Sequence, residues 1–349
     1  MKLRKIALIA LCLAVCFLSC NKDDDDGTVP VVEVRDRGEQ QDKDKDSLLK
    51  YFATHYYNSS EFEAITNPTI ADLKITKLAD GADVPDGSTL LEKAMETNLE
   101  TKEVVFADTN YEYYILKLKQ GGGVESPTFA DNVVVKYEGF TLDDAIFDSA
   151  VSPIGFDLTT LVPGWRKVFP QFNIAESFVE NGDGTVSFVN QGIGVMFLPS
   201  GLGYFSQAQA GIPAYAPIIF KFELLQTSQN DHDNDGIPSY LEDIDGDGEV
   251  FDENTDEDFD ARAGFIYNYI DSDDDGDGVL TRNELERITY VVDTNQGEQE
   301  PVLDEKVEFE VERSDNAGVI TIKTLKIVDS NNNDVDDYLE KDVTTNYNE

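Results

Sequence analysis

The aspartates in the C-terminal third of the chain stand at spacings that suit cation binding. In two loops of twelve residues, acids occupy positions 1, 3, 5 and 12, and a glycine occupies position 6. Alternate short acids can point inward, the glycine allows a sharp turn, and the distal carboxylate can bind through both oxygens, as Ca²⁺ requires. The candidate ligands are Asp231, Asp233, Asp235 and Glu242 in the first loop and Asp273, Asp275, Asp277 and Glu284 in the second.

Two further segments follow the pattern less completely. Asp334 stands at the glycine position of one of them, and His232 of the first loop occupies a non-ligand position, which predicts a solvent-exposed side chain. The alternative is a solvated, disordered acidic tail. The repeated glycine and glutamate positions favour calcium sites over that alternative. The additional candidate ligands are Asp243, Asp245 and Asp247 in one segment and Asp329, Asn331, Asn333 and Glu340 in the other.

The spacing between loops also constrains the architecture. The loops that begin at Asp231 and Asp243 start only twelve residues apart, which leaves no room for EF-hand helices on both sides. Residues 231–284 and 329–342 resemble thrombospondin type 3 repeats, in which the chain wraps around a row of calcium ions. The resemblance implies structural Ca²⁺ in a repeat region at 229–349, and residues 306–311 and 319–328 are expected to form short strands.

The middle of the chain carries five short motifs in order. They are V-K-Y-E-G-F at 135–140, I-F-D-S at 146–149, L-V-P-G-W at 161–165, P-S-G-L-G-Y at 199–204, and I-P at 212–213 with the strand-like run at 218–225. Branched residues at 133–137 and 218–225 predict strands, and residues 163–172 predict a helix, which together indicate an α+β arrangement. The ordered set resembles the FKBP-type peptidyl-prolyl isomerase family.

That resemblance implies a half-barrel antiparallel sheet wrapped on one helix, with an apolar pocket between them. Catalysis in such a pocket needs no cofactor, and the partners are proline-containing polypeptides. The family assigns hydrogen bonds to substrate carbonyls to the Val162 backbone N–H and the Tyr204 hydroxyl, while Asp148 orients Tyr137 or the twisted carbonyl. The pocket residues implied are Tyr137, Phe147, Asp148, Val162, Trp165, Tyr204, Ile212 and Phe220.

The N-terminus has the pattern of an export signal. Basic residues precede an apolar run at 6–18 that is too short to cross a hydrocarbon core of about 30 Å. The sequence L-S-C at 18–20 resembles a bacterial lipobox, which implies a lipid on Cys20 and an outer-membrane lipoprotein of the cell envelope. The four aspartates at 23–26 resemble the export tract of surface-exposed lipoproteins, although an acidic spacer is the alternative.

These patterns divide the chain into five segments. They are a signal peptide at 1–19, a flexible acidic tether at 20–46, an α+β region at 47–120, the isomerase-like domain at 121–228 and the repeat region at 229–349. A formal net charge of −43 argues against nucleic-acid partners. Two functions remain: a prolyl isomerase for exported proteins, or a non-catalytic peptide-binding or adhesion lipoprotein with a calcium-stabilised spacer.

Overall fold

The computed structural model describes residues 34–257 and 266–348. Contacts divide the chain into residues 1–35 and a compact unit of residues 36–349. The expected signal peptide, Cys20 and the acidic run at 23–26 lie outside the described residues. Within the described residues, no helix combines the length and the apolar character needed to cross a membrane.

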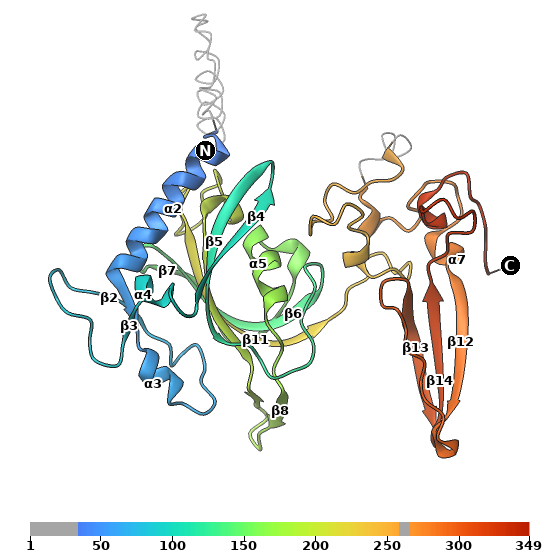
Figure 1. Cartoon of the computed structure of the whole chain (residues 1–349), viewed down its shortest axis with the longest axis horizontal. Helices are drawn as coiled ribbons and strands as arrows, with labels where there is room; N and C mark the ends of the chain where they lie inside the picture. Colours follow the sequence, from blue (N-terminus) through green and yellow to red (C-terminus); the bar gives the residue numbers. More distant parts are fainter. Residues whose placement is uncertain (1–33, 258–265, 349) are drawn as a thin grey trace, which may run out of the picture. The chain divides into compact units, whose positions relative to one another are not determined.

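A six-stranded antiparallel sheet forms the centre of the compact unit (Figure 1). Its order is β4-β5-β10-β11-β6-β7, and β10 pairs with β11 from Gly192 opposite Leu224 to Leu198 opposite Ile218. The mixed helix and sheet class agrees with the prediction. The strands are β4 (Leu99–Phe106), β5 (Thr109–Lys119), β6 (Asn132–Thr141), β7 (Ile146–Asp157), β10 (Gly192–Leu198) and β11 (Ile218–Ser228).

Helices cover both faces of this sheet, because side chains alternate between the faces along each strand. Helix α5 (Pro163–Val168) packs Trp165 and Val168 into the core on one face. Helix α2 (Arg37–Thr54) packs on the other face, where Phe52 meets the ring of Phe197 edge-on at 4.9 Å. Every residue of β10 is buried between the two layers. Burial of each large side chain of this kind contributes about 1.5–3 kcal/mol.

Helix α2 begins earlier than the sequence indicates. Residues 37–46 were expected to belong to a flexible tether, and that prediction is wrong for them. Asp36 caps the helix by accepting a hydrogen bond from the Glu39 N–H at 2.9 Å. The first turns bury polar side chains, including Asp44, whose Oδ2 accepts from the backbone N–H and the hydroxyl of Ser200. A buried polar face gives no hydrophobic periodicity, so the pattern did not reveal it.

The expected boundary between residues 47–120 and 121–228 is not a boundary of the sheet. Strands β4 and β5 belong to the first of these segments, yet β5 pairs directly with β10. The same segment also contains the end of helix α2 up to Thr54, followed by a small sheet and two short helices. These elements are β1 (His55–Tyr57), α3 (Ser59–Glu63), β2 (Ile75–Lys77), β3 (Thr89–Leu90) and α4 (Leu91–Ala94).

A separate three-stranded sheet lies in the C-terminal part, in the order β12-β14-β13. The strands are β12 (Glu286–Asp293), β13 (Glu308–Asn316) and β14 (Val319–Lys326), and the short helix α7 (Thr281–Glu284) precedes them. Two of the strands fall where they were expected, whereas β12 was missed. Leu285, Leu325 and Tyr338 form part of a small core under the acidic loops. Strands β8 (Ser177–Glu180) and β9 (Val186–Val189) form a separate two-stranded antiparallel hairpin in the chain between α5 and β10.

Candidate functional site

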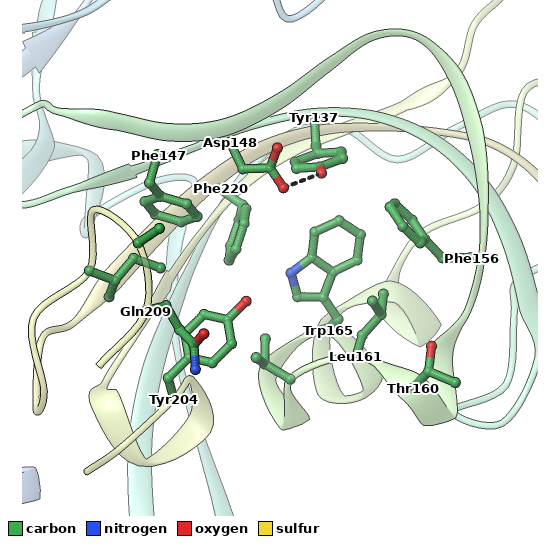
Figure 2. Close-up of a pocket in the computed structure, with 13 residues that line it drawn as sticks. Tyr137, Phe147, Asp148, Phe156, Thr160, Leu161, Trp165, Tyr204, Gln209 and Phe220 are labelled. Atoms are coloured by element: carbon green, nitrogen blue, oxygen red, sulfur yellow. Dashed lines mark hydrogen bonds between the residues drawn. The ribbon is translucent and has the colours of Figure 1, made fainter. Parts of the chain in front are cut away.

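The eight residues expected in the central pocket line one cavity of about 360 Å³ (Figure 2). The cavity lies between α5, strands β6, β7 and β11, and the segment 204–212. Five further lining residues were not predicted: four of them lie outside the quoted motifs, and the fifth, Leu161, stands in L-V-P-G-W but was not assigned to the pocket. These five are Phe156, Thr160, Leu161, Gln209 and Ala210.

Aromatic rings fix the walls of the cavity against one another. Trp165, which is 3% exposed, meets Tyr137 at 5.4 Å and Phe220 at 5.2 Å between ring centroids. Phe147 meets Phe220 edge-on at 5.5 Å. Edge-to-face contacts at these distances are favourable, so the pocket is formed before any peptide binds.

Glycine is required beneath this aromatic wall. A Cβ added at Gly139 of β6 would lie 2.7 Å from the rings of both Phe147 and Phe220. Such a distance is shorter than any ordinary carbon contact, so a side chain here would displace one of the rings. Close packing of the two rings therefore explains why glycine stands at this position of the V-K-Y-E-G-F motif.

Polar groups are few and converge on the same cavity. The Tyr137 hydroxyl donates to Asp148 Oδ2 at 2.6 Å (Figure 2). Burial, followed by the hydrogen bond to Asp148, raises the pKa of Tyr137. Burial and the charge of Asp148 also raise the pKa of Tyr204. Both hydroxyls therefore stay protonated at neutral pH and can donate hydrogen bonds.

Two donors of the pocket are free to meet a substrate. Within the described residues, neither the Tyr204 hydroxyl nor the Val162 backbone N–H donates a hydrogen bond. Val162 precedes α5 with extended backbone, so its N–H is outside the helical hydrogen-bond ladder. Figure 2 shows the Tyr204 ring and its hydroxyl beside Trp165 at the cavity.

The segment that carries Tyr204 is held by helix α2. Asp44 accepts the two hydrogen bonds from Ser200, and the Arg37 guanidinium lies 4.3 Å from the ring centroid of Phe205. Phe205 and Tyr215 have φ of 48° and 61°, and the Tyr215 N–H donates to the Phe205 carbonyl. The contacts of Asp44 and Arg37 come from residues that were expected to belong to a tether, so they could not have been predicted.

The acidic loops bring most of their candidate ligands together. Oxygens of three carboxylates lie within 4.8 Å of one another in each of four groups. Two of the groups contain the expected acids at positions 1, 3 and 5, whereas Glu253, rather than Asp247, completes the group in the segment that begins at Asp243. The groups are Asp231, Asp233 and Asp235; Asp233, Glu242 and Asp274; Asp243, Asp245 and Glu253; and Asp273, Asp275 and Asp277.

The last expected loop differs from the others. Its candidate ligands do come together, but both carboxylate oxygens of Glu340 accept hydrogen bonds, from the Asn331 amide at 2.7 Å and the Asn333 amide at 2.6 Å. Asp329 accepts from the backbone N–H groups of Asn333 and Asp334. This loop therefore satisfies its acceptors with its own amides.

The other loops contain buried carboxylate oxygens that have no hydrogen-bond partner among the described residues. Glu242 and Glu284 are each 1% exposed, and both oxygens of each are unpartnered. Asp235 and Asp275 each use one oxygen for a backbone N–H and leave the other buried and free. Burying a charge without a partner is unfavourable, so such a cluster calls for a cation.

Burial dominates the pKa shifts of these acids. Desolvation raises the pKa of Asp275 to about 6 and that of Glu284 to about 9. It raises the pKa of Asp235 to about 7 and that of Asp233 to about 8, with neighbouring aspartates adding to the effect. Without a cation, the folded loops hold protons that free aspartates would lose.

Comparison with known proteins relates part of the chain to FkpA-type prolyl isomerases. The chain is 26% identical over 165 residues to the FKBP-type peptidyl-prolyl cis-trans isomerase FkpA of Aeromonas hydrophila, a match that covers 46% of this chain and 54% of that protein. It is 30% identical over 112 residues to a probable FkpA of Neisseria meningitidis, covering 31% and 35%. It is 27% identical over 127 residues to FkpA of Escherichia coli strain K12, covering 36% and 40%.

The chain thus spans about half, or less, of the length of the curated relatives it matches. Two solved structures are similar to part of it. A peptidyl-prolyl cis-trans isomerase of Pseudomonas syringae has a TM-score of 0.29 at 23% identity and covers 37% of this chain and 81% of its own. FkpA from Escherichia coli has a TM-score of 0.30 at 24% identity and covers 39% and 54%.

A family model described as BamM C-terminal matches residues 232–310. That stretch contains the loop at 273–284 and strand β12. The sequence motifs did not predict this match. Part of the chain is homologous, at low identity, to FkpA-type FKBP prolyl isomerases.

Proposed function

We propose that this protein is a peptidyl-prolyl cis-trans isomerase that acts on X-Pro bonds of exported proteins. The observation that carries the proposal is the cavity lined by Tyr137, Phe147, Trp165 and Tyr204, in a chain that is partly homologous to FkpA-type isomerases. The reaction needs no nucleophile and no cofactor. It needs a site that binds the twisted amide more tightly than the planar one.

The cavity has the properties that this task requires. Rotation about an X-Pro bond is slow, taking tens of seconds or longer, because conjugation gives the amide partial double-bond character. At the twisted transition state the nitrogen loses that conjugation and the amide becomes less polar. The aromatic walls around Trp165 favour this state over the planar, polarised amide, which water would stabilise.

The polar groups then orient the peptide. The Val162 N–H and the Tyr204 hydroxyl are free to donate to substrate carbonyls, and Tyr137 and Asp148 are held to each other by the 2.6 Å hydrogen bond. A carbonyl fixed on each side of the rotating bond restricts rotation to the X-Pro bond itself. These residues bind and orient, and no proton is transferred.

The direct test is the cis-to-trans rate of a proline tetrapeptide, measured with the purified mature protein. Phe147→Ala removes a pocket wall, whereas Ile146→Ala changes the neighbouring residue of β7, which is 60% exposed and does not line the cavity. We expect acceleration by the wild type and by Ile146→Ala, and a loss of about tenfold or more in Phe147→Ala. A folded wild type without acceleration would favour a non-catalytic peptide-binding or adhesion lipoprotein instead.

We also propose that residues 229–349 bind structural calcium, in the manner of thrombospondin type 3 repeats. The support is the buried, unpartnered oxygens of Glu242 and Glu284 together with acids spaced within 4.8 Å. Ligands on opposite sides of Ca²⁺ are separated by about 5 Å, because each oxygen lies 2.3–2.6 Å from the ion. Calorimetric titration of the chelated protein with Ca²⁺ tests this, and an absence of binding heat and of a melting shift would contradict it.

The cellular setting is a third part of the proposal. We infer that Cys20 carries a lipid and that the protein is an outer-membrane lipoprotein of the cell envelope, facing either the periplasm or the outside. The support is the L-S-C sequence after the apolar run at 6–18. Mass spectrometry of the N-terminal peptide from the native host, with Cys20→Ser as control, would show an acylated cysteine or would contradict the proposal.

A further inference from the structure

The second residue is held in the same way in three of the acidic loops. Its backbone N–H donates to the side chain of the ninth residue in three loops, at 2.8–3.2 Å. The second residue then makes contacts beyond its own loop: His232 pairs with Asp157 at 2.9 Å, so it is not the solvent-exposed side chain that was expected. The three pairs are His232 with Ser239, Asp274 with Thr281, and Ser330 with Asp337.

Asp274 is the acidic member of this set. It is 1% exposed, and its Oδ2 accepts a hydrogen bond from the Thr281 hydroxyl at 3.0 Å. Its Oδ1 is buried and has no partner among the described residues. The side chain is therefore fixed by one oxygen while the other is presented to neighbouring groups.

Those neighbours are acids of a different loop. Oxygens of Asp274, Asp233 and Glu242 lie within 4.8 Å of one another. Glu242 is also 1% exposed, and both of its oxygens are buried and unpartnered. Burial and the mutual charges raise the pKa values of Glu242 and Asp274 well above their ordinary values.

Three carboxylates directed at one point repel each other unless a cation lies between them. Their spacing fits oxygens arranged around Ca²⁺. Mg²⁺ demands a tighter octahedron and retains its waters, so it fits less well. Position 2 is not a ligand position in the pattern that defined the loops, which is why the sequence did not single out Asp274.

We propose that Asp274 is a calcium ligand supplied across loops, completing a site with Asp233 and Glu242 and fastening loop 273–284 to loop 231–242. The inference rests on the calcium binding proposed above. It adds that one ion joins Glu242 to a residue 32 positions later in the chain. Calcium then holds the repeat region together by bridging its loops as well as by filling each one.

The variant Asp274→Asn tests this in the full mature chain, because it has the same shape and can keep the Thr281 hydrogen bond. Removing one of three repelling charges should leave the melting temperature in chelator equal or higher. The rise in melting temperature on adding calcium should shrink, and one calcium site should weaken by about tenfold or more in calorimetric titration. Asp342→Asn is the matched control, since Asp342 is exposed and belongs to no carboxylate group among the described residues.

A double-mutant cycle with Glu242→Gln identifies the shared ion. If Asp274 and Glu242 hold the same ion, the loss caused by Asp274→Asn will be much smaller in the Glu242→Gln background. Additive losses would overturn the inference. So would a variant that binds calcium like wild type, or one that melts lower by the same amount with calcium and with chelator, because that pattern marks a purely structural role.

Failure of the calcium-binding proposal as a whole would give a different experimental result from failure of the cross-loop ligand. In that case the wild type would bind no calcium, and none of the variants would change a calcium response. A wild type that binds calcium beside an unaffected Asp274→Asn would overturn the cross-loop ligand alone.

Discussion

The central pocket and the acidic loops are organised by opposite means. The pocket is assembled from rings that attract one another, with Trp165 in edge-on contact with Tyr137 and Phe220. The loops are assembled from carboxylates that repel one another, with Glu242 and Glu284 buried and unpartnered. The first arrangement is complete without a ligand, whereas the second requires a cation.

The contacts between the two regions include the pair of His232 with Asp157 and a buried cluster of ion pairs around Glu249. Glu249, in the segment after Asp243, pairs with Arg166 at 2.6 Å and with Lys167 at 2.8 Å. Both cations lie on α5 beside Trp165 of the pocket. Since this contact uses no oxygen of the proposed calcium ligands, we expect the pocket to keep its form when calcium is removed.

Removal of calcium should have the largest effect, confined to the repeat region. An ion present at a thousand times its dissociation constant stabilises the folded state by about 4 kcal/mol. Scanning calorimetry with calcium and with chelator should show one transition that moves strongly and one that does not. Trp165, the single tryptophan, identifies the unmoved transition by its fluorescence. If the repeat region melted at the same temperature under both conditions, the expected difference in calcium dependence between the two regions would be contradicted.

A methyl group beneath the pocket should have the next largest effect, confined to the pocket. Gly139→Ala places a Cβ 2.7 Å from Phe147 and Phe220, and overpacking of this kind costs about 1–3 kcal/mol. We expect isomerase activity to fall by about tenfold while calcium binding stays normal. Gly155→Ala is the control, because its nearest atom would be 4.0 Å away. Full activity in Gly139→Ala would contradict the pocket geometry.

The two regions should respond differently to pH. In chelator, the pKa values of Asp275, Asp235 and Glu284 are raised in the folded state to about 6, 7 and 9. The folded loops therefore bind more protons than the unfolded chain, and their free energy of unfolding falls as pH rises through 6 to 9, by about 1 kcal/mol per pH unit for each extra proton. Saturating calcium should remove this fall, because bound ligands are ionised.

Pocket activity should be flat over the same pH range. The pKa values of Tyr137 and Tyr204 are raised by burial, so neither hydroxyl titrates near neutrality. The measurements are chemical denaturation and the tetrapeptide assay at each pH. A repeat region whose stability in chelator rises with pH would contradict the buried-carboxylate account.

Loss of one pocket hydroxyl should have the smallest effect. Tyr204→Phe removes a neutral hydrogen bond worth about 1 kcal/mol, so kcat/KM should fall by roughly fivefold. Tyr215→Phe serves as a control because the Tyr215 ring packs against Phe205, the neighbour of Tyr204 in the chain, and does not line the cavity. A thousandfold loss in Tyr204→Phe would mean that the hydroxyl does chemistry that the account does not include.

The sequence predicted the pocket better than its surroundings. Residues such as Tyr137 and Trp165 stand in ordered motifs, so their convergence followed from the resemblance. The role of β4 and β5 in the same sheet depends on pairing with β10, which no local pattern encodes. The early start of α2 was missed because its buried face includes Asp44.

The same distinction holds for the acidic loops. Ligands within one loop, such as Asp231 and Asp235, follow from the spacing of the chain. Asp274 joins its group through a tertiary contact between two loops, which spacing within a loop cannot reveal. Glu253 stands at position 11 of its own loop, which is not a ligand position in the pattern. Patterns along the chain therefore identify ligands within one loop, whereas ligands shared between loops can be identified only from the three-dimensional structure.

The most direct test is the prolyl isomerisation rate of one full mature preparation, measured with calcium and with chelator. The account predicts acceleration under both conditions, differing by less than about twofold, while calorimetry of the same samples shows the repeat region losing its calcium stabilisation. A folded protein that does not accelerate isomerisation under either condition would contradict the central claim that the aromatic pocket is an isomerase site.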